Sequence, residues 1–341
     1  MVWLSGRVIS FRSKGVIMSI LIVGGAGYIG SHVNKLLARK GFDTVVLDNL
    51  VYGHKEAVVA GEFVQGDLAN KDDIRKAFEG RDIDAVFHFA NFAYVGESCL
   101  DPEKYYVNNI SNTLNLLSVM REQGCGKIIF SSSCSTYGVP ERVPITEDLP
   151  QHPMSPYAST KLMIEMILRD YASAYGLRYV GFRYFNACGA DPEGEIGESH
   201  TPETHLIPIT LDVASGLRDE MMVFGNDYNT PDGTNIRDYV HVLDLAEAHI
   251  AALDYFDKGG ENDFFNIGTE KGFSNLEIIE AVKRVTGRDF PVVITDRRPG
   301  DPDILVGSSE KARRVLGWVP KYSDIETVIE TAWKWHENKK F

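Results

Sequence analysis

Apolar runs and helical patterns alternate along the first half of the chain. Strands that are apolar on both faces are typical of a parallel sheet that helices cover on each side. The sequence therefore predicts an α/β fold: a doubly wound parallel sheet of the Rossmann type with right-handed crossovers. The expected strands are 19–25, 42–49, 62–67, 84–90, 126–133 and 177–186, and the expected helices are 28–41 and those near 71–79, 103–121 and 156–175.

The second half of the chain has a different composition. Residues 187–205 are rich in glycine, proline and acidic residues, and we expect them to form a long loop of the kind that is often functional. Shorter segments follow, which predict a smaller α+β region interleaved with the first. The predicted parts are an extension over 1–17 that is disordered or not native, a Rossmann domain over 18–187 to which 238–268 returns, and a second region over 188–341.

Charge and composition argue against several classes of protein. Lys and Arg number 35 against 48 Asp and Glu, so the net charge is −13, and no long basic run offers a nucleic acid a binding surface. No run of about 18 apolar residues is present, so we expect no membrane-spanning helix. The four cysteines form no C-x-x-C pair and no histidine cluster has zinc spacing, which predicts reduced thiols, a cytoplasmic location and no metal site.

A glycine turn, GGAGYIG, joins the first strand to the first helix. Glycines at Gly24, Gly27 and Gly30 would allow a tight turn and the close approach of a pyrophosphate to the helix N-terminus. Asp48 ends the second strand. A carboxylate at this position can accept a hydrogen bond from the 2′-hydroxyl of the adenosine ribose of NAD and would repel the 2′-phosphate of NADP. The pattern predicts NAD rather than NADP. Asp67 ends the third strand, where it either reaches the adenine or begins a helix.

The stretch SPYASTKLM places Tyr157 four residues before Lys161, so a helix would carry both on one face. One interpretation is purely structural: the tyrosine packs against the protein and the lysine is solvated. The carboxyl ends of the parallel strands, however, bring this helix start to the same edge as the glycine turn. There Lys161 and a positive nicotinamide ring could lower the phenol pKa enough for Tyr157 to act as a base. Ser133, the last residue of SSS, is the favoured hydroxyl partner.

These features together resemble the extended short-chain dehydrogenase/reductase family, and within it the UDP-glucose 4-epimerases. The resemblance rests on GGAGYIGSH, LDNL, VGES, FSSSCSTYG, SPYASTKLM, RYFN, FGNDYNTPDGTNIRDYVHVLDLA and RRPGD, and it runs from about 19 to 338. It implies reversible epimerisation at C4 of a UDP-sugar with tightly bound NAD. It also implies a homodimer that pairs the 103–121 and 156–175 helices.

The resemblance assigns roles position by position. Tyr157 would be the base, Ser133 its hydroxyl partner, and Lys161 a ligand of the nicotinamide ribose. The implied NAD contacts are Gly24, Gly27, Tyr28, Ile29, Gly30, Asp48, Asn49, Asp67, Leu68, Phe89, Ala90, Asn108, Lys161 and Phe185. The implied UDP-sugar contacts are Ser133, Tyr157, Asn186, Leu206, Phe224, Arg237, Arg298 and Asp301.

The sequence departs from the family pattern at three places. Ala93 stands where many relatives have a lysine near the cofactor, and His205 and Leu206 stand where an Asn-Asn-Leu run contacts UDP. Leu305 replaces a bulky tyrosine, so UDP-GlcNAc, UDP-GalNAc or a UDP-pentose are alternative substrates.

Three other functions are possible for a chain with these motifs: a 4,6-dehydratase, a UDP-glucuronate decarboxylase and a non-enzymatic regulator. A 4,6-dehydratase would need an Asp-Glu pair where Cys134 and Ser135 stand, and the NDYNTPDGT segment disfavours a UDP-glucuronate decarboxylase. A non-enzymatic NAD(H)-binding regulator would not need Tyr157 and Lys161, yet this chain has both, which argues against a regulator.

Overall fold

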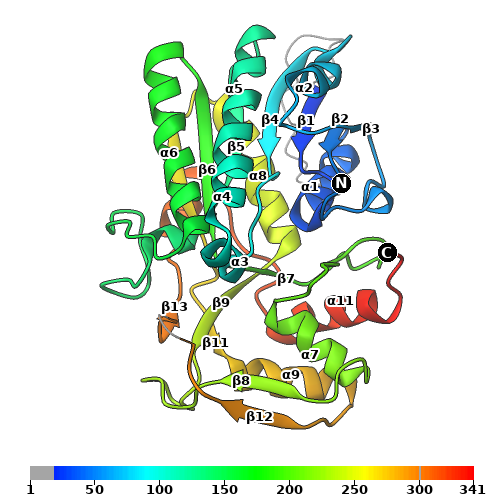
Figure 1. The fold of residues 1–341 in the computed structure, drawn as a ribbon, viewed down its shortest axis with the longest axis vertical. Coiled ribbons are helices and arrows are strands. Elements are labelled where there is room, and N and C mark those ends of the chain that lie inside the picture. The colour runs from blue at the N-terminus through cyan, green and yellow to red at the C-terminus, as the bar shows by residue number, and fades with distance from the viewer. Residues whose placement is uncertain (1–18, 299–300) are drawn as a thin grey trace, which may run out of the picture.

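Seven parallel strands form the large sheet of this protein (Figure 1). The computed structural model describes residues 19–298 and 301–341; the expected extension over 1–17 lies outside them. The strand order is β10-β6-β5-β4-β1-β2-β3, which confirms the predicted doubly wound sheet. The strands are β1 (Ser19–Val23), β2 (Asp43–Asp48), β3 (Glu62–Gln65), β4 (Ile83–His88), β5 (Lys127–Ser133), β6 (Arg178–Tyr184) and β10 (Asp263–Ile267).

Helices cover both faces of this sheet because the residues that point to either face of its strands are apolar. Ile20 and Ile22 of β1 pack in the core with α1 and α8, whereas Leu21 and Val23 pack in the opposite core with α2, α5 and α6. Figure 1 shows α5 and α6 side by side on one face. The helices are α1 (Tyr28–Arg39), α2 (Lys71–Phe78), α3 (Val95–Leu100), α4 (Pro102–Tyr105), α5 (Asn112–Glu122), α6 (Pro156–Tyr175), α8 (Val242–Asp257) and α10 (Glu310–Leu316).

A smaller region lies below the large sheet in Figure 1. One sheet joins β9 to β7, β11 and β13, a two-stranded sheet joins β8 to β12, and a third apolar core includes residues of α7, α9 and α11. The elements are β7 (Asn186–Cys188), α7 (Leu206–Ala214), β8 (Met221–Phe224), β9 (Ile236–His241), β11 (Gly272–Ser274), α9 (Asn275–Thr286), β12 (Val292–Thr295), β13 (Ile304–Leu305) and α11 (Ile325–Glu337).

The chain passes between the two regions several times. The expected strand 177–186 is two strands, because β6 ends at Tyr184 in the large sheet and β7 pairs with β9 in the small one. β9 leads directly into α8, which packs on the large sheet, and β10 completes that sheet. These crossings bring the two regions together at the carboxyl ends of the large-sheet strands.

No helix in 19–298 or 301–341 is both long and apolar enough to cross a membrane.

Candidate functional site

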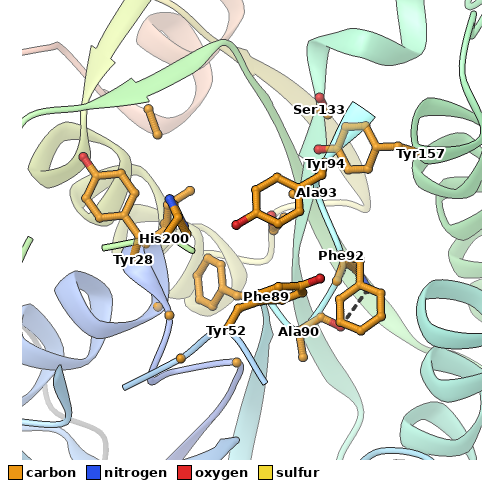
Figure 2. A pocket seen from close by; sticks show the side chains of 18 of the residues that line it. Tyr28, Tyr52, Phe89, Ala90, Phe92, Ala93, Tyr94, Ser133, Tyr157 and His200 are labelled. Atoms are coloured by element: carbon orange, nitrogen blue, oxygen red, sulfur yellow. Dashed lines mark hydrogen bonds between the residues drawn. The ribbon is translucent and has the colours of Figure 1, made fainter. Parts of the chain in front are cut away.

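A cavity of about 460 Å³ opens at the carboxyl ends of the large-sheet strands. Its wall takes residues from the loops after β1, β2, β3, β4 and β5, from the start of α6, and from β7, β9 and β13. This is the position at which open parallel sheets bind ligands. Figure 2 shows Tyr28 and His200 on one side of the cavity and Tyr157 and Ser133 on the other.

The glycine turn after β1 leaves backbone exposed to the cavity. Gly24 has a φ of +81°, and a Cβ there would lie 2.5 Å from the nitrogen of Ala90; a Cβ on Gly30 would lie 2.3 Å from the oxygen of Gly24. Side chains are therefore excluded at both positions. Gly27 precedes α1, and no side chain caps this helix. The free N–H groups of its first turn suit a pyrophosphate, so the turn fits the cofactor predicted from the sequence.

Asp48 is buried at the end of β2 and faces the cavity. Its carboxylate accepts hydrogen bonds from the backbone nitrogens of Ala26 (3.0 Å) and Leu50 (2.8 Å). Burial raises the pKa of Asp48, against the lowering by these hydrogen bonds. Asp67 accepts a hydrogen bond from Asn49 Nδ2 (2.9 Å) and also lines the cavity. Both acids are thus fixed where a ribose or an adenine could meet them.

Tyr157 and Lys161 share one face of α6, as their spacing predicts. Ser155 caps the helix by accepting a hydrogen bond from the nitrogen of Ala158 (3.2 Å), and Pro156 is the first helical residue. Lys161 Nζ lies 5.7 Å from the centre of the Tyr157 ring. Both residues line the cavity, so the helix start delivers them to the same place.

Burial dominates the titration of this pair in the chain by itself. It raises the pKa of Tyr157 to about 12, although the hydrogen bond with Ser133 lowers it. It also lowers the pKa of Lys161 to about 7. These directions apply to the chain without a cofactor. The predicted lowering of the phenol pKa by Lys161 and a positive nicotinamide ring concerns the loaded enzyme and stays a prediction, since a positive charge bound in the cavity would favour the phenolate.

Lys161 is held by two acceptors. Its Nζ donates to Asn91 Oδ1 (2.8 Å) and to the carbonyl oxygen of Ser131 (2.7 Å).

The three serines of β5 point to the two faces of the sheet in turn, as the alternation along a strand predicts. Ser132 Oγ donates to Glu165 Oε1 (2.6 Å) on the α6 side, whereas Ser131 and Ser133 line the cavity.

The remaining cofactor positions predicted from the sequence also line this cavity. They are Tyr28, Ile29, Leu68, Phe89, Ala90, Asn108 and Phe185.

The predicted substrate residues divide into two groups. Asn186 and Arg237 line the cavity together with Ser133 and Tyr157. The other four, Leu206, Phe224, Arg298 and Asp301, do not line it.

These four residues lie in the smaller region. Arg298 stacks on Phe224, with 3.9 Å between the guanidinium carbon and the ring centre. Asp301 forms an ion pair with Arg237 and also accepts a hydrogen bond from Asn235 Nδ2 (2.8 Å). Asp301 is thereby joined to the cavity through Arg237. The role of each predicted site residue stays a prediction.

Sequence reasoning missed several cavity residues in the loop after β4. Asn91, which holds Lys161, and Tyr94 both lie there. The adjacent segment 106–111 is a π-helix, a feature that often marks functional sites. It places Asn108 on the cavity, while the side chain of Asn109 bonds the backbone of Phe92 on this loop. Irregular loops have no period that a sequence pattern could reveal.

Comparisons with known proteins agree with this geometry. The model of the NAD dependent epimerase/dehydratase family matches residues 20–268. UDP-glucose 4-epimerase of Streptococcus mutans serotype c is 52% identical over 324 residues, which cover 94% of this chain and 97% of that protein.

Two solved structures share the fold over most of their length. UDP-glucose 4-epimerase from Brucella ovis in complex with NAD has a TM-score of 0.91 and 51% identity, covering 93% of this chain and 97% of that one. The enzyme from Bifidobacterium longum in complex with NAD⁺ and UDP has a TM-score of 0.89 and 37% identity, covering 94% and 99%.

Proposed function

The chain belongs to the NAD dependent epimerase/dehydratase family, and we infer from this premise that it epimerises a UDP-sugar at C4, interconverting UDP-glucose and UDP-galactose. The observation that carries this inference is the continuity of one cavity. The same wall joins the glycine turn at Gly24 and Gly30 to Tyr157, Ser133 and Arg237. A dinucleotide and a UDP-sugar therefore have neighbouring positions in it.

The chain's own residues have separate tasks in this reaction. Tyr157 takes the proton of the C4 hydroxyl and later returns it, while Ser133 holds that hydroxyl in place. Lys161 keeps a positive charge beside the phenol. Arg237, which lines the cavity, binds the diphosphate and so leaves the sugar free to turn and present its other face. Arg298 has the same predicted role but does not line the cavity in this structure. Bound NAD⁺ supplies the acceptor for the C4 hydride and then its donor.

Proton NMR of UDP-galactose incubated with the purified chain tests the function directly. Appearance of UDP-glucose to a fixed ratio, with no NAD added, is the expected result, because the cofactor is regenerated in each cycle. A chain that gives no UDP-glucose even with NAD supplied contradicts the function.

Asp48 determines the choice of cofactor in this proposal. We expect Asp48→Asn to weaken NAD binding and to reduce the preference for NAD over NADP by about tenfold or more, because the repulsion of a 2′-phosphate is lost. Titration of the cofactor-free protein with each dinucleotide measures this preference. Asp170→Asn, an exposed position on α6, is the matched control and should keep the original preference. Equal preference in the Asp48 variant and the control would argue against the role.

Leu305 supports a broad choice of sugar. It lines the cavity from β13 and is partly buried, and it is smaller than a tyrosine. We propose that an N-acetyl group at C2 is accommodated there. Leu305→Tyr should lower kcat/KM for UDP-GlcNAc by about tenfold or more and should change the value for UDP-galactose far less. Parallel assays with both sugars check this. Absence of UDP-GlcNAc turnover in the unaltered chain would remove the proposal, and turnover of UDP-xylose would favour a pentose instead.

A second copy of the chain is the proposed partner of α5 and α6. These neighbouring helices cover one face of the large sheet and expose Leu114, Met163 and Met166, and the π-helix before α5 exposes Tyr106 and Val107. We propose that these five residues form one apolar patch, because its burial against a second copy would favour association and the two helices of each copy could form a four-helix contact.

Charged substitutions in this patch test the dimer. Leu114→Asp combined with Met166→Asp should halve the mass measured by light scattering, because a carboxylate is costly to bury at an interface. Leu217→Asp, an exposed leucine in the smaller region, should leave the mass unchanged. A monomeric unaltered chain at micromolar concentration would contradict the dimer.

We further propose that the large-sheet part holds NAD, that the smaller region holds the UDP-sugar, and that the protein works in the cytoplasm. In support of the last point, the cysteines at 99, 125, 134 and 188 are all free thiols.

A further inference from the structure

Four side chains of one eight-residue stretch, ESHTPETH (198–205), meet at the cavity wall, which Glu198, His200 and His205 help to line. Glu198, His200, Glu203 and His205 each offer one ligand atom, and these atoms lie within 4.8 Å of one another. The stretch belongs to no helix or strand and ends where α7 begins. The chain has no C-x-x-C pair and no histidine cluster at zinc spacing, so no metal site was expected from the sequence.

The distances between these atoms are those of ligands around one small ion. His205 Nδ1 lies 2.7 Å from Glu198 Oε1 and 3.2 Å from Glu203 Oε1. His200 Nδ1 lies 3.2 Å from Glu198 Oε1 and 3.5 Å from Glu203 Oε2. Zinc bonds to nitrogen and oxygen are about 2.0–2.2 Å long, so neighbouring ligands of a tetrahedral ion lie about 3.3–3.5 Å apart. The four distances between histidine and glutamate atoms, 2.7–3.5 Å, lie at or below this value, and all the ligand atoms lie within 4.8 Å of one another.

Three of the buried atoms in this group have no hydrogen bond of acceptable geometry to any described residue. They are Glu198 Oε1, His200 Nδ1 and Glu203 Oε2. Glu198 is only 6% exposed, and its Oε1 has the two imidazole nitrogens as close neighbours but no well-directed hydrogen bond, which is costly for a buried carboxylate. The backbone nitrogens of Thr204 and His205 donate to Glu203 Oε1, which orients this carboxylate toward the others. A single cation between the four side chains would satisfy all three atoms.

A nearby acidic group provides the contrast. The carboxylates of Asp191, Glu193 and Glu195 surround Lys35, whose Nζ lies 2.6–3.0 Å from each, so their cation is a side chain. Within 19–298 and 301–341 the only ion pairs of Glu198 and Glu203 are with His200 and His205, and no Lys or Arg pairs with either acid. Without an ion, protonated imidazoles balance the two carboxylates. A bound divalent cation would replace those protons, because two carboxylates with two neutral imidazoles carry a charge of −2.

We propose that Glu198, His200, Glu203 and His205 bind one divalent cation, with zinc preferred. Imidazole and carboxylate ligands suit this ion, and four protein ligands make a closed site of the structural kind. The cation would hold the 198–205 stretch against the cavity wall. The His200 ring lies 6.3 Å from that of Tyr28 and 6.2 Å from that of Tyr94, between centres, and Figure 2 shows it beside Tyr28.

Metal analysis of the purified full chain, without a polyhistidine tag, tests this site. About one zinc per chain is expected, either as purified or after metal-free protein is titrated with zinc. Removal of the ion by a chelator should lower Tm by about 5 °C or more, because the ion binds the folded chain alone. Less than a tenth of an equivalent bound after zinc is supplied would overturn the proposal.

Variants assign the ion to these residues. Glu198→Gln and His205→Gln should each lose most of the bound zinc, and Glu193→Gln in the Lys35 group should keep it. Cobalt in the unaltered chain should give the strong visible absorption of a tetrahedral ion with nitrogen and oxygen ligands, which does not depend on the folding of any variant. Weak absorption of octahedral cobalt, or zinc retained by both variants of this stretch, would place the ion elsewhere and contradict the proposal.

Discussion

Replacement of Tyr157 by phenylalanine should reduce kcat for UDP-galactose by about 10³-fold or more. The variant keeps the ring that packs at the start of α6 but removes the only group assigned to take the C4 proton, and general acid–base catalysis typically contributes about 10²–10⁴-fold. Removal of the phenol also takes away one of the two proposed hydrogen-bond partners of the substrate hydroxyl, which adds to the effect. Steady-state turnover, followed by coupled detection of UDP-glucose, measures this loss.

The control lies on the same helix. Tyr175 is 54% exposed at the end of α6, so Tyr175→Phe makes the same chemical change away from the cavity and should leave kcat unaltered. Circular dichroism and retained NAD should be the same in both variants. A Tyr157→Phe protein that turns over at more than about a tenth of the original rate would mean that another group is the base.

Replacement of Lys161 by methionine should reduce kcat at neutral pH by about 10²-fold. A positive charge about 5 Å from a phenolate contributes about 3 kcal/mol at an effective dielectric near 20, which is about two pKa units. Without that charge the pKa of Tyr157 in the loaded enzyme rises, so less phenolate is present at pH 7. Methionine fills similar space, although it leaves Asn91 Oδ1 and the Ser131 carbonyl without their donor.

The pH profile separates this effect from simple damage to the site. Because the base becomes harder to ionise, the alkaline rise of kcat in the variant should move upward by about two pH units, and activity should partly recover at high pH. Lys340→Met, at an exposed position near the C-terminus, should keep both rate and profile. A loss that is equal at every pH would show that Lys161 positions other groups and does not tune the base.

The sequence could predict those parts of the site that depend on short, regular stretches. The glycine turn directly follows an apolar strand, so the sequence alone was enough to place Gly24 and Gly30 at the crevice. Tyr157 and Lys161 are one turn apart on a helix with a clear cap, and Ser133 ends a strand of known alternation. For Tyr157, Lys161 and Ser133 the local period fixes the direction of the side chain.

The rest depended on contacts between distant segments. Arg237 of the IRDYVH stretch was predicted to bind the UDP-sugar, but the sequence did not show which strands this stretch pairs with. It forms β9 and pairs with β7, β11 and β13. That pairing places Arg237 on the cavity, whereas Arg298, in the segment between β12 and β13, does not line it. The pKa of Tyr157 also escaped prediction, because the spacing of Tyr157 and Lys161 reveals their proximity but not how deeply both are buried. The ligand residues of the 198–205 cluster follow the spacing E-x-H-x-x-E-x-H, which is neither a C-x-x-C pair nor a histidine spacing typical of zinc sites.

The most direct test of the central claim follows a deuterium atom at C4 of UDP-galactose. The label is expected at C4 of the UDP-glucose formed, without exchange into water and without added NAD, because the hydride leaves and returns to the same carbon while Tyr157 handles only the hydroxyl proton. Product that has lost the label to solvent would contradict the account, since C4 would then have been inverted by removal of a proton from carbon and not by hydride transfer.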